Sequence, residues 1–194
     1  MKIERPKSRQ PIPDHAKKVF SGVLFDVYQW EQKLFDGTTA TFEKIKRADT
    51  VIIFPVLKDG RIILTEQEQP GMKPFLGTAG GRVDPGEEII NAAKRELLEE
   101  TGHEADNFIL WEASQSSSKI ESVVYTFIAK GCEKIADINL DAGEKINLKY
   151  VTFDEFIELV FNNEKFVGQA IIRKILEARL DSKKMIELKE LFKI

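Results

Sequence analysis

Hydrophobic and polar residues alternate near the start of the chain. From Val19 to Phe35 the pattern is rich in valine and aromatic residues, which is typical of strands with one buried face. Asp36-Gly37 is a favoured hairpin turn, and residues 38–45 are expected to return as a paired strand. The pattern predicts a small antiparallel β unit over residues 18–46.

Further along, the apolar positions run together. Val51 to Leu57 is almost continuously apolar, as expected of a strand covered on both faces, and a turn at Lys58-Asp59-Gly60 leads into a second strand, residues 61–68. Three more strands are predicted at residues 108–114, 123–129 and 146–151. Helical periodicity then covers residues 153–161, 168–179 and 183–192.

One helix is predicted in the middle of the chain, from Ile89 to Thr101. Asp84-Pro85-Gly86 is a turn sequence before it, and Gly102 is a suitable left-handed stop after it. Apolar residues at i, i+3 and i+7 form a stripe that can face a core: Ile90, Ala93 and Leu97.

The same helix carries three glutamates on a neighbouring face. Glu96, Glu99 and Glu100 stand at i, i+3 and i+4, where like charges repel unless a cation balances them. Mg²⁺ is such a cation, because it prefers oxygen ligands and often shares a substrate phosphate. Taken alone, such a face is more often simply solvated, so the residues around it decide the interpretation.

Those residues complete a longer motif. Residues 81–103 read GRVDPGEEIINAAKRELLEETGH, and this run resembles the Nudix box, the signature of Mg-dependent hydrolases of nucleoside diphosphate-linked compounds. Only His103 departs, where the family usually has an aliphatic residue. The positions that fit are Gly81, Glu87, Arg95, Glu96, Leu97, Glu99, Glu100 and Gly102.

The resemblance implies a fold and a role for each motif residue. The expected fold is α/β: a Nudix α/β/α sandwich with a mixed sheet, preceded by the N-terminal antiparallel β unit. Gly81, Glu87 and Gly102 would be structural, with Glu87 and Arg95 holding the loop against the helix. The residues expected to bind Mg²⁺ or Mn²⁺ are Glu96, Glu99, Glu100 and the carbonyl of Gly80; those expected to serve catalysis are Glu99, Glu100, Arg95 and Glu144.

Beyond the motif, the chain is similar to the ADP-ribose pyrophosphatase and nucleotide-sugar hydrolase branch. In that branch the N-terminal strands build a homodimer and each active site borrows residues from its neighbour. Glu144 is the best candidate for the late acid, a metal ligand or general base, with Asp141 behind it. The residues expected near the substrate are Arg47, Gln69, Trp30 and Tyr28, although Gln69 stands where ADP-ribose hydrolases often carry Arg, which weakens an assignment to ADP-ribose itself.

Composition narrows the setting. The 194 residues suggest an extended leader (1–17), the N-terminal β unit (18–46, dimerisation) and a Nudix domain with C-terminal helices (47–194). A net charge of −3 argues against a nucleic-acid-coating protein, and no apolar stretch approaches the ~20 residues of a membrane span. The single cysteine, Cys132, and the absence of an apolar signal segment favour the cytoplasm.

The expected function is therefore Mg-dependent hydrolysis of a pyrophosphate bond in ADP-ribose or a nucleotide sugar, by metal-activated water. The alternative is a Nudix-fold module that senses such a nucleotide without turnover, which would not need the repulsive carboxylates. A role in RNA decapping is a third possibility, disfavoured by the acidic balance of charge.

Overall fold

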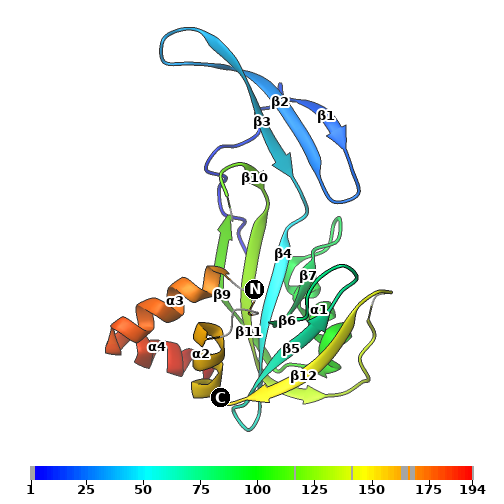
Figure 1. Cartoon of the computed structure of the whole chain (residues 1–194), viewed down its shortest axis with the longest axis vertical. Coiled ribbons are helices and arrows are strands. Elements are labelled where there is room, and N and C mark those ends of the chain that lie inside the picture. Colours follow the sequence, from blue (N-terminus) through cyan, green and yellow to red (C-terminus); the bar gives the residue numbers. More distant parts are fainter. Residues whose placement is uncertain (1–2, 116, 141, 163–165, 167–168, 194) are drawn as a thin grey trace.

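The computed structural model describes residues 3–115, 117–140, 142–162, 166 and 169–193. A narrow sheet stands at one end of the molecule, and a larger sheet with helices on both faces forms the rest (Figure 1). In the described part of the chain, no helix is long and apolar enough to cross a membrane.

The narrow N-terminal sheet is built from β1 (Lys17–Ser21), β2 (Asp26–Lys33) and β3 (Thr39–Lys46), paired antiparallel in that order. The alternating stretch from Val19 to Phe35 thus holds two strands, because the chain reverses between Ser21 and Asp26, where the Gly22 amide donates to the Phe25 carbonyl. The sheet gains a fourth strand that the pattern did not predict, β10 (Ile120–Glu121), parallel to β3.

The larger sheet is mixed, as predicted. Its central strands are β4 (Thr50–Leu57) and β11 (Val123–Lys134), which run parallel. β4 pairs on its other edge with β7 (Ala79–Arg82) and then β5 (Ile62–Glu68), and β5 continues to β6 (Phe75–Gly77) and β12 (Lys145–Val151). β11 pairs with β9 (Asn107–Gln115) and β8 (His103–Glu104).

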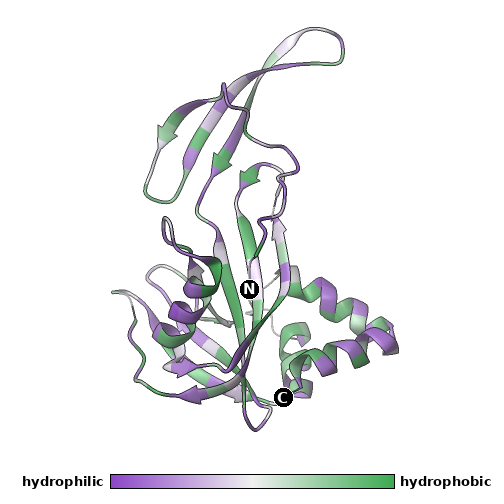
Figure 2. Cartoon of the chain, turned by 180° about the vertical axis from the view of Figure 1, so that it is seen from behind, coloured by the Kyte–Doolittle hydropathy of each residue, from purple (hydrophilic) through white to green (hydrophobic). Residues whose placement is uncertain are grey.

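Helices cover both faces of this sheet, which confirms the predicted α/β/α sandwich. α1 (Ile89–Thr101) lies on one face; α2 (Phe153–Asn162), α3 (Gln169–Leu180) and α4 (Ser182–Phe192) lie on the other (Figure 1). Alternate residues of β4 explain the two layers: Val51 and Ile53 pack toward α1, while Phe54 and Val56 pack toward the other helices. Hydrophobic residues are accordingly concentrated along the central strands (Figure 2).

The helix that carries the acidic face spans the predicted residues. Ala93 and Leu97 are fully buried against the sheet, and Ile90 is partly buried against the same core. Gly102 ends the helix at φ 72°, donating its amide to the Leu98 carbonyl. Glu96 directly precedes the buried Leu97 and Glu100 follows it by three residues, so packing this stripe fixes where their carboxylates point.

In its described part, residues 3–16, the leader forms no helix or strand, but it is not detached. Ile3 packs against the core on the α1 side, and Ser8 and Gln10 accept hydrogen bonds from Lys44 of β3. The leader therefore runs along the junction between the two sheets.

Candidate active site

The acidic face of α1 forms one wall of a cleft of about 480 Å³, named here the acidic cleft. Glu96 and Glu100 are buried, and Glu99 is half-buried. The linker between β3 and β4 and the segment before β12 complete the walls. The lining residues that matter below are Leu24, Arg47, Gly80, Gly81, Glu96, Glu99, Glu100 and Glu144.

Arg95 holds the acids and the preceding loop together. Its guanidinium donates to both carboxylate oxygens of Glu87, at 3.0 Å each, and to the Arg82 carbonyl at 3.0 Å. It also donates to Glu96 at 2.8 Å and to Glu99 at 3.1 Å. The planar fork thereby fixes the loop on the helix and supplies positive charge beside two of the three glutamates.

Glu100, unlike Glu96 and Glu99, contacts the backbone of Gly80 rather than Arg95. Its Oε2 accepts a 2.9 Å hydrogen bond from the Gly80 amide. Burial raises the pKa of the Glu100 carboxyl to about 8, although the Gly80 hydrogen bond opposes the rise. Burial likewise raises the pKa of Glu96, against the effect of Arg95. Two buried acids with raised pKa values are a typical property of a binding or catalytic site.

The two glycines before the helix let these carboxylates approach the backbone. A Cβ on Gly81 would lie 2.3 Å from Glu96 Oε1, and a Cβ on Gly80 would lie 2.3 Å from the Val51 carbonyl oxygen. Only glycine allows both contacts. The double glycine of the motif is therefore explained by close packing of β7 against β4 and α1.

Residues far away in the sequence enter the same cleft. Glu144 lines it from the segment before β12, and its charge contributes to the raised pKa values of Glu96 and Glu100. Arg47 lines it from the linker, where its Nη2 lies 3.4 Å from Thr50 Oγ1. Asp141, the second choice for the late acid, lies outside the described residues.

Comparison with known proteins identifies the family. The profile of the NUDIX domain matches residues 46–172, which is more than half of the chain. The chain belongs to the Nudix family.

Individual relatives agree with the predicted branch. The chain is 28% identical to the ADP-ribose pyrophosphatase of Bacillus subtilis (strain 168), over 77% of this chain and 83% of the relative. It is 31% identical to the ADP compounds hydrolase NudE of Escherichia coli (strain K12), over 60% of this chain and 66% of the relative. It is also 25% identical to the methanol dehydrogenase activator of Bacillus methanolicus, over 81% of this chain and 86% of the relative.

The Nudix fold is found in solved structures too. A crystal structure of an ADP compounds hydrolase superposes with a TM-score of 0.71 at 22% identity, covering 90% of this chain and 95% of that one. The predicted resemblance is confirmed: the chain is a Nudix hydrolase of nucleoside diphosphate-linked compounds, on the ADP-ribose pyrophosphatase branch.

The structure does not bring every candidate residue to the acidic cleft. Gln69 lies outside its lining. Trp30 is 6% exposed, packs against Phe42 in the N-terminal sheet and donates its indole N–H to Gln32. Tyr28, half-buried on the same sheet, lies beneath the Lys18 ammonium. In a single subunit both aromatic residues are therefore separate from the acids.

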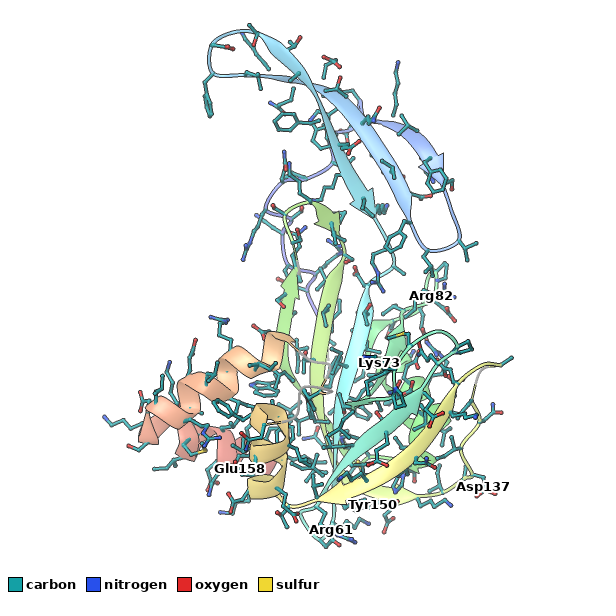
Figure 3. The ribbon with its side chains drawn as sticks, viewed as in Figure 1. Arg61, Lys73, Arg82, Asp137, Tyr150 and Glu158 are labelled. Atoms are coloured by element: carbon teal, nitrogen blue, oxygen red, sulfur yellow. The ribbon has the colours of Figure 1, made fainter. Side chains whose placement is uncertain are left out.

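Some residues of the acidic cleft were not predicted from the sequence. Leu24, Arg82 and Asn139 line it, and the Asn139 amide donates to the Glu99 carbonyl at 2.9 Å, which fastens the late loop to α1. Arg82 lies at the end of β7 nearest the N-terminal sheet (Figure 3). Arg82 occupies a variable position of the motif, whereas Leu24 and Asn139 lie outside it and only the fold brings them to the acids.

His103 departs from the Nudix pattern for a structural reason. It is 3% exposed, and its Nδ1 lies 2.7 Å from the Thr101 carbonyl, to which it must donate. Burial lowers the pKa of this imidazole, which favours the neutral form. The ring therefore fills a core position. Cys132 is also buried, and burial raises the pKa of its thiol to about 12.

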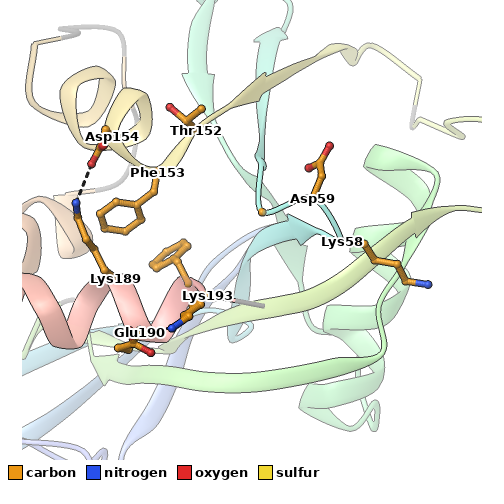
Figure 4. Close-up of a pocket in the computed structure, with 10 residues that line it drawn as sticks. Lys58, Asp59, Thr152, Phe153, Asp154, Lys189, Glu190 and Lys193 are labelled. Carbon is orange, nitrogen blue, oxygen red and sulfur yellow. Dashed lines mark hydrogen bonds and ion pairs between the residues drawn. The ribbon is translucent and has the colours of Figure 1, made fainter.

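A hollow of similar size lies elsewhere, between the β4–β5 turn, α2 and α4 (Figure 4). Its walls mix cations and acids with Phe153 and Phe192, and Asp154 pairs with Lys189 at 3.2 Å. Because its carboxylates are offset by lysines, it has none of the unbalanced negative charge of the acidic cleft.

The side chains that line the acidic cleft offer the type of ligand atom, oxygen, that a hard divalent cation prefers. Carboxylate oxygens predominate, two of the carboxyls are buried, and their raised pKa values show that more positive charge would stabilise the ionised forms. In the described part of the chain, no three acidic, histidine or cysteine side chains already converge on one point. Arg95 and the Gly80 amide hold the glutamates in their present directions.

Proposed function

We propose that this Nudix hydrolase cleaves the pyrophosphate bond of ADP-ribose or a related nucleotide sugar, and that it requires Mg²⁺ or Mn²⁺. The observation that carries the proposal is the pair of buried glutamates, Glu96 and Glu100, in a cleft beside Arg47. The relatives named for ADP-ribose and ADP compounds support ADP-linked substrates as the first to test. GDP-mannose and other nucleotide sugars come next.

In this proposal the metal would be held by Glu96, Glu99, Glu100 and the Gly80 carbonyl. The bound ion would activate a water molecule and offset charge on the phosphates. Arg95 orients two of these glutamates and the loop that carries Gly80, so it supports the catalytic geometry without contacting substrate. Arg47 would bind a phosphate of the substrate, a role supported by its exposed guanidinium group in the lining of the cleft.

Glu144 is proposed as the general base. It lines the cleft from the segment before β12, and among the described lining residues it is the acid that lies outside the helix and its motif. A base must reach the attacking water, and a carboxylate in the same cleft as the proposed metal ligands suits that role.

The proposal includes a homodimer working in the cytoplasm. Support for the dimer comes from apolar residues exposed on β1 and the turn after it, including Val23 at 95% and Leu24 at 62% exposed. Leu24 also lines the acidic cleft, so a partner packed on this turn would lie beside the active site. Tyr28 and Trp30 would bind the base of the substrate from this sheet. The single cysteine fits a reducing compartment.

The test is a panel of diphosphate-linked nucleotides, each incubated with and without Mg²⁺, with released nucleoside monophosphate as the measurement. Metal-dependent release from ADP-ribose, lost in Glu100→Gln, is the expected result. Arg61→Gln is a suitable control, since Arg61 lies far from the cleft, against the Tyr150 ring (Figure 3). A panel without turnover under either metal would refute the proposal.

The alternative of a nucleotide-sensing module keeps one specific observation in its favour. A relative of similar identity is named as an activator of another enzyme. Tight binding of a panel compound without hydrolysis would favour this alternative, whereas release of 5′-monophosphorylated RNA from a capped transcript would favour decapping.

A further inference from the structure

Arg5, in the leader, joins the linker between β3 and β4 to β10. Its Nε and Nη2 donate to the two carboxylate oxygens of Asp49, at 3.1 Å each, and its Nη1 donates to Glu121 Oε1 at 3.1 Å. Asp49 belongs to the linker between β3 and β4, and Glu121 belongs to β10. A two-point contact of this kind fixes orientation as well as distance.

A buried lysine continues the network. Lys44 is 1% exposed, and its ammonium donates to Ser8 at 2.9 Å, to the Gln10 carbonyl at 2.6 Å and to Glu121 Oε2 at 2.7 Å. Arg5 and Lys44 thus balance the two carboxylates of Asp49 and Glu121. The leader is fastened at Ile3, at Arg5 and at residues 8–10, across the junction of the sheets.

The linker that the network holds is the one that carries Arg47. The Arg47 amide donates to the Glu121 carbonyl at 3.3 Å, and the Val123 amide donates to the Asp49 carboxylate at 2.8 Å. The Val83 amide donates to the Asp49 carbonyl at 2.9 Å. The backbone of the linker is therefore anchored at Arg47 itself and at Asp49, and each anchor involves a partner of Arg5.

The Arg47 side chain lies where two cavities adjoin. One is the acidic cleft, and the other, of about 620 Å³, lies between the turn after β1 and the loop before α1. Its guanidinium lies 6.0 Å from the Phe25 ring centroid. Arg5 lines only the second cavity, so it is next to the site but does not face the acids.

We infer that Arg5 is a positioning residue: through Asp49 and Glu121 it fixes the linker so that Arg47 is held in place for substrate. The inference rests on the proposed function, because it assigns Arg47 to substrate binding. Without Arg5, the Lys44 ammonium still pairs with Glu121, but the Asp49 carboxylate loses its charged partner in the network. Repulsion between the two carboxylates then loosens the linker, and Arg47 must be reordered each time substrate binds.

The first test compares Arg5→Gln with Arg9→Gln, a control in the same leader whose side chain is exposed. Arg5→Gln is expected to raise KM for the best panel substrate about fivefold with kcat within about twofold, and Arg9→Gln to match the wild type. Arg5→Lys should be intermediate, because an ammonium cannot reproduce the fork. In an Arg47→Ala background, Arg5→Gln should change KM no further. Equal KM values for both glutamine variants, or additive effects with Arg47→Ala, would overturn the inference.

The second test needs no turnover and so separates this inference from the proposed function. Amide hydrogen exchange at Val83 and Val123 reports directly on the Asp49 anchors. Faster exchange confined to these amides and the linker in Arg5→Gln supports the inference. Unchanged exchange, or faster exchange spread evenly through the chain, would reject it even if the substrate panel succeeds. A failed panel with local loosening would reject only the proposed function.

Discussion

At the scale of single residues, the adjacent glycines Gly80 and Gly81 differ in what surrounds them. A Cβ on Gly80 would collide with the Val51 backbone, which cannot move without disturbing the sheet, whereas one on Gly81 would meet the movable end of Glu96. Gly80→Ala should therefore lower the free energy of unfolding by about 2–4 kcal/mol, measured in urea. Gly81→Ala should fold nearly as well but lower kcat/KM at least about tenfold, because Glu96 is displaced. Equal stability loss in both variants would contradict this account.

Glu100 gives a prediction that links stability to pH. In the metal-free protein its pKa is raised from 4.5 to about 8, so the unfolded chain releases this proton first as pH rises. The free energy of unfolding should fall between about pH 4.5 and 8. Glu100→Gln should not show this fall, and by pH 8 it should be roughly 2–4 kcal/mol more stable than the wild type.

Urea unfolding with a chelator, at pH 4.5 and pH 8, measures the difference between wild type and Glu100→Gln. Adding Mg²⁺ should stabilise the wild type at pH 8 more than the variant. Finding the metal-free proteins equally stable at pH 8 would show that Glu100 is not strained by burial. A gain in stability together with lost turnover is the pattern expected of a functional acid.

At the scale of elements, hydrophobic periodicity was sufficient to predict a helix or strand that buries an apolar face of its own. α1, the central strands and the C-terminal helices were predicted from their patterns, with ends that shift by about one residue, except that β11 continues five residues past its predicted end at residue 129. The short strands β6, β7, β8 and β10 were missed, because two to four residues show no period and pair only once the sheet has formed. The motif located Glu96, Glu99 and Glu100, but nothing local places Leu24 or Asn139 beside them.

Glu121, on β10 at the junction with β3, gives a second prediction that links stability to pH. Burial would raise the pKa of Glu121, but its hydrogen bonds with Lys44 and Ser8, and the contact with Arg5, lower the pKa overall. A carboxyl with a lowered pKa stabilises the fold above its ordinary value near 4.5, and this contribution is lost as the pH falls below it. Glu121→Gln should thus cost about 1–3 kcal/mol at pH 7, with the difference from wild type closing below about pH 4.5.

Urea unfolding of Glu121→Gln and wild type, from pH 7 to well below pH 4.5, makes the comparison. Glu43→Gln is a suitable control, since Glu43 is an exposed carboxylate on the same sheet, paired with Gln29. A difference between Glu121→Gln and wild type that does not depend on pH would show that packing, rather than charge, explains the effect.

At the scale of the whole molecule, the N-terminal sheet is attached to the core by the leader, the linker and β10, and much of it faces outward (Figure 1). Of its buried residues, Lys44 contacts the leader, and Trp30 packs against Phe42 within the sheet. The apolar residues of β1 and the turn after it remain exposed in one subunit: Val19, Phe20, Val23, Leu24 and Phe25. An isolated subunit of this shape has an apolar surface beside its own cleft, which a second copy would cover.

This surface leads to the last prediction, on the homodimer. Val23→Asp places a charge in the centre of the exposed apolar turn, so it should convert the dimer to a monomer in sedimentation equilibrium. Leu180→Asp is the matched control, because Leu180 is 89% exposed on the C-terminal helices, and it should remain dimeric. If each cleft borrows residues from its neighbour, the Val23→Asp monomer should also show a KM raised at least about tenfold, while Leu180→Asp keeps wild-type kinetics. A wild type that is monomeric and fully active at micromolar concentration would refute the dimer, and a Val23→Asp dimer would move the interface elsewhere.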